Sequence, residues 1–173
     1  MKRWLRRPLV VLAAVTVSCF AGSGLVHSGE EQNLRAIGEV TALSDINQTG
    51  QVLVRVERDG HTTWWSVDDT TEATWLTDPI ETVPSSQDCA GQICYRVAGD
   101  ALRVDVSQDG GATYTVAWQI DGDAYNLLAH TYPDLGDAAQ HLSSRSVVVH
   151  ATANGYVVFV ANGRDGLLFR DEG

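Results

Sequence analysis

Two segments of this chain repeat each other at a constant offset of 41 residues, as Ser66 and Ser107 illustrate. Seven pairs of identical residues share this offset: Gly50/Gly91, Gln51/Gln92, Arg55/Arg96, Val56/Val97, Asp59/Asp100, Ser66/Ser107 and Asp68/Asp109. A looser third copy begins at Gly155. Because repeats of about 40 to 45 residues are typical of units with four short strands, the period predicts consecutive small β-sheets.

Short segments of alternating apolar and polar residues support this prediction. Residues 51–57 and 62–67 read as two strands joined at Asp59-Gly60, a dipeptide that favours tight hairpins. The same arrangement recurs further along the chain. Its predicted strands are residues 93–97 and 102–106, joined at Gly99-Asp100, then 146–150 and 156–160, followed by Asp165-Gly166 and a strand at 167–169.

One octapeptide in the second copy carries a family resemblance. The run from Ser107 to Tyr114, SQDGGATY, resembles the Asp box S-x-D-x-G-x-T-W of BNR-type β-propellers. Four of its polar or glycine positions match, and Tyr114 stands in the aromatic slot. The segments Cys94-Tyr95-Arg96-Val97 and Val160 to Gly166 are also similar to exported actinobacterial proteins.

The resemblance implies a structural turn and gives little information on activity. In the family, the Asp box caps the turn between the third and fourth strands of a blade, away from the ligand face. The Asp109 carboxylate can accept backbone N–H bonds across such a turn. Gly111 supplies a conformation that a Cβ would resist, Tyr114 packs its ring against the sheet, and Ser107 and Thr113 complete the motif.

The first copy of the box is degenerate. Ser66 and Asp68 are present, but the glycine is missing and the aromatic residue, Trp75, comes two positions late. The predicted fold is therefore all-β, with about three propeller-blade-like antiparallel sheets, the last incomplete, preceded by an N-terminal signal or anchor helix. The expected ranges are residues 1–27 for the leader and 28–173 for the repeat domain, with blades at 35–78, 80–120 and 140–173 and an insertion at 121–139.

Three such sheets are too few for a closed ring, which takes at least four blades. Two arrangements stay open from the sequence. Either the sheets form an open fan or a compact sandwich, or two chains close one ring as a homodimer.

The N-terminus has the layout of a bacterial export signal. A basic segment, Met1 to Arg7, precedes an uncharged apolar run from Leu9 to Val26. This run is close to the length that spans a bilayer, so an uncleaved anchor is one expectation. A lipoprotein is the second, because Val17-Ser18 before Cys19 resembles a lipobox, although Thr16 departs from it. Cleavage and secretion is the third. All three place the domain at the outer face of the cell membrane or beyond it.

The cysteines agree with export. Cys89 and Cys94 are the only two cysteines after residue 19. In an oxidising compartment such a near pair most often forms a disulfide, here across the short loop Ala90 to Ile93. Two free thiols are the alternative. A zinc site is not expected, because no second Cys or His pair stands at ligand spacing.

The charge excludes one class of partner. From residue 20 onward the chain has eight Arg, no Lys and 22 acidic residues, a net charge of −14. Such a domain is repelled by nucleic acid and by anionic lipid headgroups. We therefore expect no nucleic-acid partner and no contact with the membrane except through the N-terminal anchor.

Catalytic and cofactor motifs are weak in this sequence. A sialidase-like glycosidase would need three arginines around one carboxylate, for which Arg55, Arg96 and Arg145 are available. Two of these are equivalent repeat positions, which argues against the enzyme. Asp121-Gly122-Asp123 resembles the start of a calcium loop, but the later ligand positions are wrong and a solvated turn is the better interpretation. No catalytic residue, metal or cofactor is expected.

The adjacent residues Trp64 and Trp65 are the best candidates for recognition. Neighbours on a strand point to opposite faces, so only one ring can enter a core. The other packs against the next sheet or forms a stacking platform for a sugar or peptide. The sequence thus predicts an exported, non-catalytic module that binds a protein or glycan of the cell envelope. A glycoside hydrolase and a structural subunit of an envelope assembly are the alternatives.

Overall fold

The computed structural model describes residues 38–45, 51–68, 73–78, 83–131 and 138–171. The predicted leader, with Cys19, lies outside these residues. In the part of the chain that is described, no helix is long and apolar enough to cross a bilayer. The strands are β1 Glu39–Asp45, β2 Gln51–Arg58, β3 His61–Asp68, β4 Ala73–Leu76, β5 Gln87–Ala90, β6 Ile93–Val97, β7 Arg103–Ser107, β8 Thr115–Gln119, β9 Ser146–Thr152, β10 Gly155–Ala161 and β11 Leu167–Asp171.

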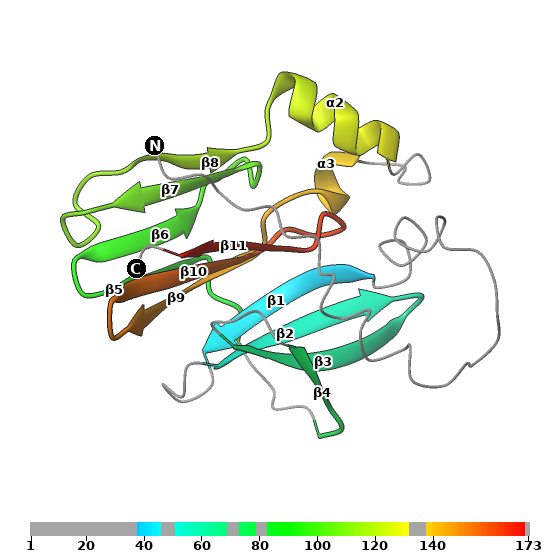
Figure 1. Cartoon of the computed structure of the whole chain (residues 1–173). Helices are drawn as coiled ribbons and strands as arrows, with labels where there is room; N and C mark the ends of the chain where they lie inside the picture. The colour runs from blue at the N-terminus through cyan, green and yellow to red at the C-terminus, as the bar shows by residue number, and fades with distance from the viewer. Residues whose placement is uncertain (1–37, 46–50, 69–72, 79–82, 132–137, 172–173) are drawn as a thin grey trace, which may run out of the picture.

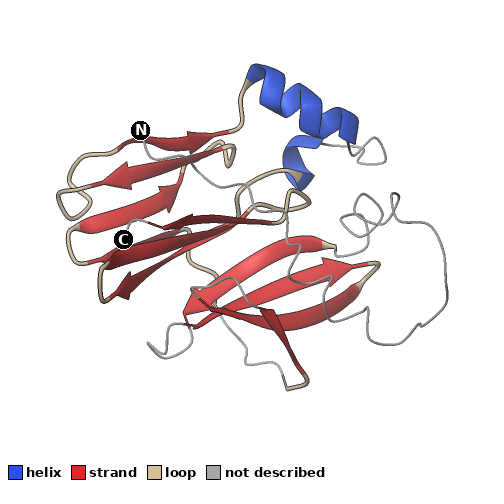
Figure 2. Cartoon of the chain, in the orientation of Figure 1, coloured by secondary structure: helices blue, strands red, loops and turns tan. Residues whose placement is uncertain are grey.

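These strands form three antiparallel sheets (Figures 1 and 2). The first sheet has the order β1-β2-β3-β4, the second β5-β6-β7-β8 and the third β11-β10-β9. The mostly-β architecture predicted from the alternating patterns is confirmed. Two helices, α2 Gly122–Thr131 and α3 Ala138–His141, were not predicted. They lie together at one end of the molecule (Figure 2), and α2 replaces the solvated turn expected after Asp121.

The third sheet lies between the other two, although it comes last in the sequence (Figure 1). Alternate residues of β10 therefore enter two different cores. Val157 and Phe159 face the first sheet, whereas Val158 and Val160 face the second. The core between the first and third sheets contains Val40, Leu43, Val52, Val54, Val56, Val67, Val148, Val157, Phe159, Ala161, Leu167 and Phe169. The core between the second and third sheets contains Tyr95, Val104, Trp118, Ile120, Leu142, Val147, Val149, Val158, Val160 and Leu168.

Residues that correspond in the repeat point inward in both outer sheets. Val54 lies in the first core, and its counterpart 41 positions later, Tyr95, lies in the second. The strand neighbours Arg55 and Arg96 consequently point outward, at opposite ends of the stack. In a propeller ring, corresponding faces would instead all point the same way round the axis. The described residues thus form a three-layer stack, and no closed ring is seen among them.

Strand β9 is where the three sheets meet. The segment around the start of β5 accepts hydrogen bonds from two of its backbone amides, and β1 bonds to one of its side chains. Val147 N donates to Ser85 O at 2.9 Å, and Val149 N donates to the Asp88 carboxylate at 2.8 Å. On the other side, Leu43 N of β1 donates to Ser146 Oγ at 2.8 Å. These bonds fix the registration of the layers.

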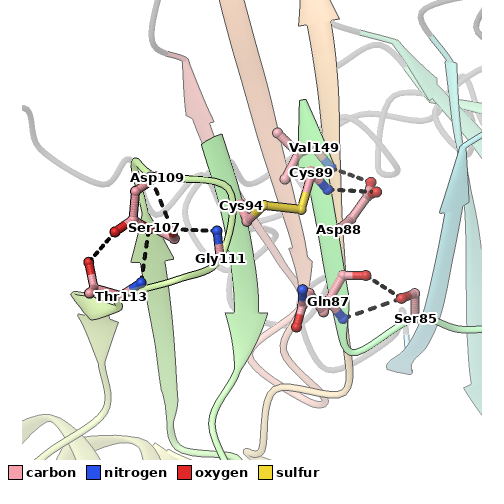
Figure 3. Close-up of a disulfide and its surroundings, with 10 residues drawn as sticks. All are labelled: Ser85, Gln87, Asp88, Cys89, Cys94, Ser107, Asp109, Gly111, Thr113 and Val149. Carbon is pink, nitrogen blue, oxygen red and sulfur yellow. Dashed lines mark hydrogen bonds between the residues drawn. A yellow bond between two sulfur atoms is a disulfide. The ribbon is translucent and has the colours of Figure 1, made fainter. Parts of the chain in front are cut away.

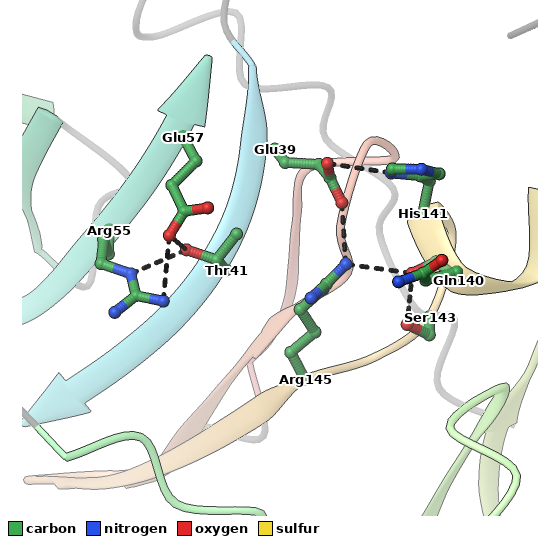
Figure 4. Close-up of polar contacts among 8 residues, drawn as sticks. All are labelled: Glu39, Thr41, Arg55, Glu57, Gln140, His141, Ser143 and Arg145. Atoms are coloured by element: carbon green, nitrogen blue, oxygen red, sulfur yellow. Dashed lines mark hydrogen bonds and ion pairs between the residues drawn. The ribbon is translucent and has the colours of Figure 1, made fainter. Parts of the chain in front are cut away.

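A polar cluster ties β1 to the segment that enters β9 (Figure 4). The Glu39 carboxylate accepts two hydrogen bonds, one on each oxygen. The donors are Arg145 Nη2 at 2.8 Å and His141 Nδ1 at 3.0 Å. Arg145 Nη2 also donates to Gln140 O at 3.0 Å. Below this cluster, the loop after β10 bonds to β1 through Val40 N and Gly163 O at 3.0 Å. Side-chain and backbone bonds together anchor α3 and this loop to the first sheet.

The hairpin turns follow the local sequence where a tight turn was predicted. Asp59 and Gly60 both have positive φ, 51° and 76°, as a two-residue primed turn requires, and Arg58 pairs with His61 on either side of them. The turn at Gly99-Asp100 is longer than expected. It is closed by a hydrogen bond from Ala98 N to Arg103 O, and the residue with positive φ is Ala101. This moves the start of β7 to Arg103.

Candidate functional site

The five Asp-box residues lie between β7 and β8, and Figure 3 shows four of them, Ser107, Asp109, Gly111 and Thr113. The Asp109 carboxylate accepts three hydrogen bonds. One oxygen accepts from Ser107 Oγ at 2.6 Å and from Thr113 N at 2.9 Å, and the other accepts from Thr113 Oγ1 at 2.6 Å. Ser107 Oγ in turn accepts Gly111 N at 2.8 Å. Gly110 and Gly111 adopt φ values of 71° and 93°, which a side chain would strain. All of these groups are used within the turn itself.

These bonds favour the ionised form of Asp109. The hydrogen bond from Ser107, followed by those from Thr113, holds the pKa of this carboxyl well below its ordinary value. Because the folded state has the lower pKa, the unfolded chain takes up the proton first as the pH falls. The stabilising contribution is therefore complete above the ordinary pKa of about 3.9 and is lost as the pH falls towards the lowered value.

The replacement Asp109→Asn tests this turn. An amide cannot accept from the Ser107 and Thr113 hydroxyls and the Thr113 N–H at once, so we expect a lower Tm at pH 6. The difference from wild type should shrink as the pH is lowered from about 4 to 2. Thermal unfolding followed by circular dichroism measures both effects. Asp100→Asn is the matched control, because among the described residues Asp100 accepts a hydrogen bond from Leu102 N alone, and an amide oxygen can accept the same bond. A pH-independent difference for Asp109→Asn would contradict the assignment.

Tyr114 lies over a charged network on the outer face of the second sheet. Its ring centroid is 3.7 Å from Arg96 Cζ, a cation–π contact. Arg96 and Arg103 both approach Asp105, with Arg96 Nη2 3.3 Å and Arg103 Nε 2.9 Å from its two oxygens. Asp105 itself is only 4% exposed. The sequence did not predict this network, although the hairpin register that pairs Arg96 with Asp105 could have revealed it.

The degenerate box does not bring its three residues together. Ser66 is buried on the outer face of β3, and Asp68 ends that strand. Trp75 lies on β4 directly opposite Trp65, so it shares the face of Trp65 and points away from the face that carries Ser66. Residues 69–72, which would form the turn, lie outside the described residues.

The tryptophans divide between the two faces of the first sheet. Trp65 packs against the first core. Trp64 points to the outer face of the sheet, where its cross-strand partners are Arg55 and Leu76. Both rings are half-buried. Trp75, which the sequence linked only to the degenerate box, is 55% exposed. It stands on β4, an edge strand of the first sheet (Figure 1).

The predicted disulfide is confirmed. Cys89 and Cys94 are directly opposite each other on β5 and β6, with Cα atoms 4.1 Å apart (Figure 3). Cys94 is buried and Cys89 is exposed. The bridge adjoins Asp88, whose carboxylate also accepts Cys89 N at 2.8 Å. It therefore fixes the hairpin that reaches strand β9.

The residues proposed for a glycosidase are not brought together. Arg55 bonds to Thr41 and Glu57 on the outer face of the first sheet, and Arg96 lies at the opposite end of the stack. Arg145 is paired with Glu39. Within the described ranges, no three His, Cys, Asp or Glu side chains are grouped so that they could hold a metal ion.

Comparison of the chain with protein-family models, with curated proteins and with solved structures finds no match. Function is therefore inferred from this chain's own residues.

Proposed function

We propose that this chain is a non-catalytic module, displayed outside the cytoplasm, that binds a glycan of the cell envelope. The Asp-box resemblance and the export-type N-terminus support this proposal from the sequence. The Cys89–Cys94 disulfide agrees with an oxidising compartment. Under this proposal the three sheets are blade-like units that serve as a rigid frame for a binding surface.

One observation carries the proposal: Trp75 is 55% exposed and directly opposite Trp65 on the neighbouring strand. Side chains opposite each other in an antiparallel pair lie on the same face, so the two indoles form one aromatic strip. The strip lies on strands rather than on a loop, and one of its rings is anchored in the core. A large ring held in water on a rigid element is a common feature of recognition sites.

The surroundings of this strip favour a sugar over a protein partner. Exposed hydroxyl side chains lie beside the rings: Thr63 accepts Trp65 Nε1 at 3.3 Å, and Thr77 is two residues from Trp75, directly after β4. Stable protein interfaces usually have an apolar centre of several residues. Among the described residues, the other large exposed apolar side chains are scattered singly: Val83, Val116 and Leu127. A sugar ring presents C–H groups on one face and hydroxyls at its rim, which matches an aromatic ring among threonines.

Titration of the full chain with soluble β-1,4-linked oligosaccharides of glucose and of N-acetylglucosamine tests this function. We expect saturable binding by calorimetry, and we expect Trp75→Ala to weaken it by about tenfold or more, a loss of about 1.4 kcal/mol or more. Val116→Ala is the matched control, because Val116 is also 55% exposed but lies on the second sheet. Absence of binding to both sugar series, or unchanged binding by Trp75→Ala, would overturn the proposal.

A further inference from the structure

We propose that the outer face of the second sheet holds an oxyanion-binding site, formed by Arg96 and Arg103 and separate from the tryptophan strip. The ligand group is a carboxylate or phosphate carried by a small molecule or glycan. This assignment goes beyond the proposed function, because the two sites lie at opposite ends of the three-layer stack.

The charges of this cluster do not balance. Two guanidinium groups approach the single carboxylate of Asp105, which leaves one positive charge uncompensated within the cluster. Asp109, the nearest acidic residue along the turn, forms no ion pair with either arginine in the described structure. The excess positive charge is unusual in a chain whose net charge is −10. A bound anion would neutralise it.

The geometry leaves hydrogen-bond donors free. Arg96 uses its Nε and Nη2 groups on one oxygen of Asp105, both at 3.3 Å. Arg103 approaches the other oxygen through Nε alone. Among the described residues, no acceptor is bonded to Nη1 of Arg96 or to Nη1 and Nη2 of Arg103, so the Nη1–Nη2 edge of Arg103 is open. This edge is the fork that binds carboxylate or phosphate in bidentate fashion.

The cluster is both rigid and accessible. The Arg96 and Arg103 side chains are 43% and 37% exposed, so a ligand can reach them. The Tyr114 ring covers one face of Arg96 and fixes the plane of its guanidinium. The Tyr114 hydroxyl is buried and bonded to no partner in the described structure. Because this hydroxyl is enclosed, Tyr114 acts on the site through its ring contact with Arg96.

Titration of the full chain with glucuronate, with inorganic phosphate and with neutral glucose, at constant ionic strength, tests this site. The readout is the Nε–Hε signals of the arginines by NMR. We expect saturable shifts for Arg96 and Arg103 with one or both anions, at a Kd of about 1 to 10 mM, and no shift with glucose. Binding of glucuronate alone assigns the site to carboxylates, and binding of both anions assigns it to oxyanions in general.

Variants separate this role from a purely structural ion pair. Arg103→Gln should weaken binding by about tenfold, and Arg103→Lys should recover it only in part, because lysine keeps the charge but lacks the fork. Arg58→Gln is the control, since Arg58 is an exposed arginine paired with exposed Asp59 on the first sheet. Trp75→Ala should leave anion binding unchanged, so this site and the glycan site can fail independently.

Two results would overturn the proposal. One is the absence of saturable shifts with either anion, which would leave Arg96 and Arg103 as structural partners of Asp105. The other is an equal loss of binding in Arg58→Gln and Arg103→Gln, which would indicate diffuse attraction to positive charge. A fold check by circular dichroism on Arg103→Gln ensures that lost binding reports the site.

Discussion

Replacement of Gly163 by alanine is expected to destabilise the protein by about 3 kcal/mol or more. Gly163 has a φ of 56°, where a side chain is strained, and its Cβ would lie against the carbonyl of His141, only 2.9 Å from the carbonyl carbon. That carbonyl cannot move easily, because it accepts Arg164 N at 2.8 Å. Gly163 is also bonded to Val40 of β1, so the clash would disturb the connection between the first and third sheets.

The neighbouring Gly166 provides a matched control for this effect. It lies in the same loop with a φ of 88°, but a Cβ there would have no atom within 4 Å. Gly166→Ala should therefore cost only the backbone strain, about 1 kcal/mol. Denaturant unfolding of both variants separates strain from steric contact. Equal losses in the two variants would mean that the loop does not approach His141 as described.

The second large effect is expected from two adjacent residues of β10. Phe159 is 1% exposed in the first core, where its ring meets Phe169 edge-on at 5.4 Å, and Phe159→Ala should cost about 3 to 5 kcal/mol. Val158 is fully buried in the second core, and Val158→Ala should cost about 2 kcal/mol. In a two-layer sandwich one of two adjacent residues faces solvent. Only a middle layer makes both substitutions costly.

Val116→Ala sets the baseline for this pair of variants, because its exposed side chain should change stability by less than about 0.5 kcal/mol. The free energy of unfolding is measured for all three variants in the same denaturant. If Val158→Ala costs no more than Val116→Ala, the second sheet does not cover the third sheet, and the three-layer arrangement is wrong.

The features that the sequence predicted are those determined by short segments. The alternation around Val52 and Val54 predicts strands, the Asp59-Gly60 dipeptide predicts its turn, and the spacing of Cys89 and Cys94 predicts their bridge. Each depends on residues within one hairpin. Helix α2 was missed because its apolar residues do not form one clear face, with Leu127 exposed and Tyr125 turned to the second core.

The order of the layers depends on contacts between distant segments, which the repeat does not encode. A signal was nevertheless present. Runs such as Val147-Val148-Val149 in β9 and Val157 to Ala161 in β10 are apolar at every position, as in sheets covered on both faces. The first two copies place Arg55 and Arg96 among their apolar residues and so retain one polar face. That contrast identifies the third copy as the middle sheet.

The candidate sites were less predictable than the fold. Trp64 and Trp65 lie on the strand next to the exposed ring, but Trp75 could be assigned only once the register of β3 and β4 was known. The pair of arginines at Asp105 likewise requires the register of β6 and β7. Both sites are made by side chains that meet across strands, so spacing along the chain does not reveal them.

The Asp88 carboxylate occupies a backbone donor at the edge of the third sheet. Strand β9 ends the third sheet, and three successive valines at an unpaired sheet edge would be a template for intermolecular β-aggregation. Val147 and Val149 instead donate to Ser85 O and to Asp88, so these two amides are not free to pair with another chain. A charged side chain at this position also repels an incoming strand. The hairpin that carries the disulfide thus covers part of the exposed edge of the third sheet.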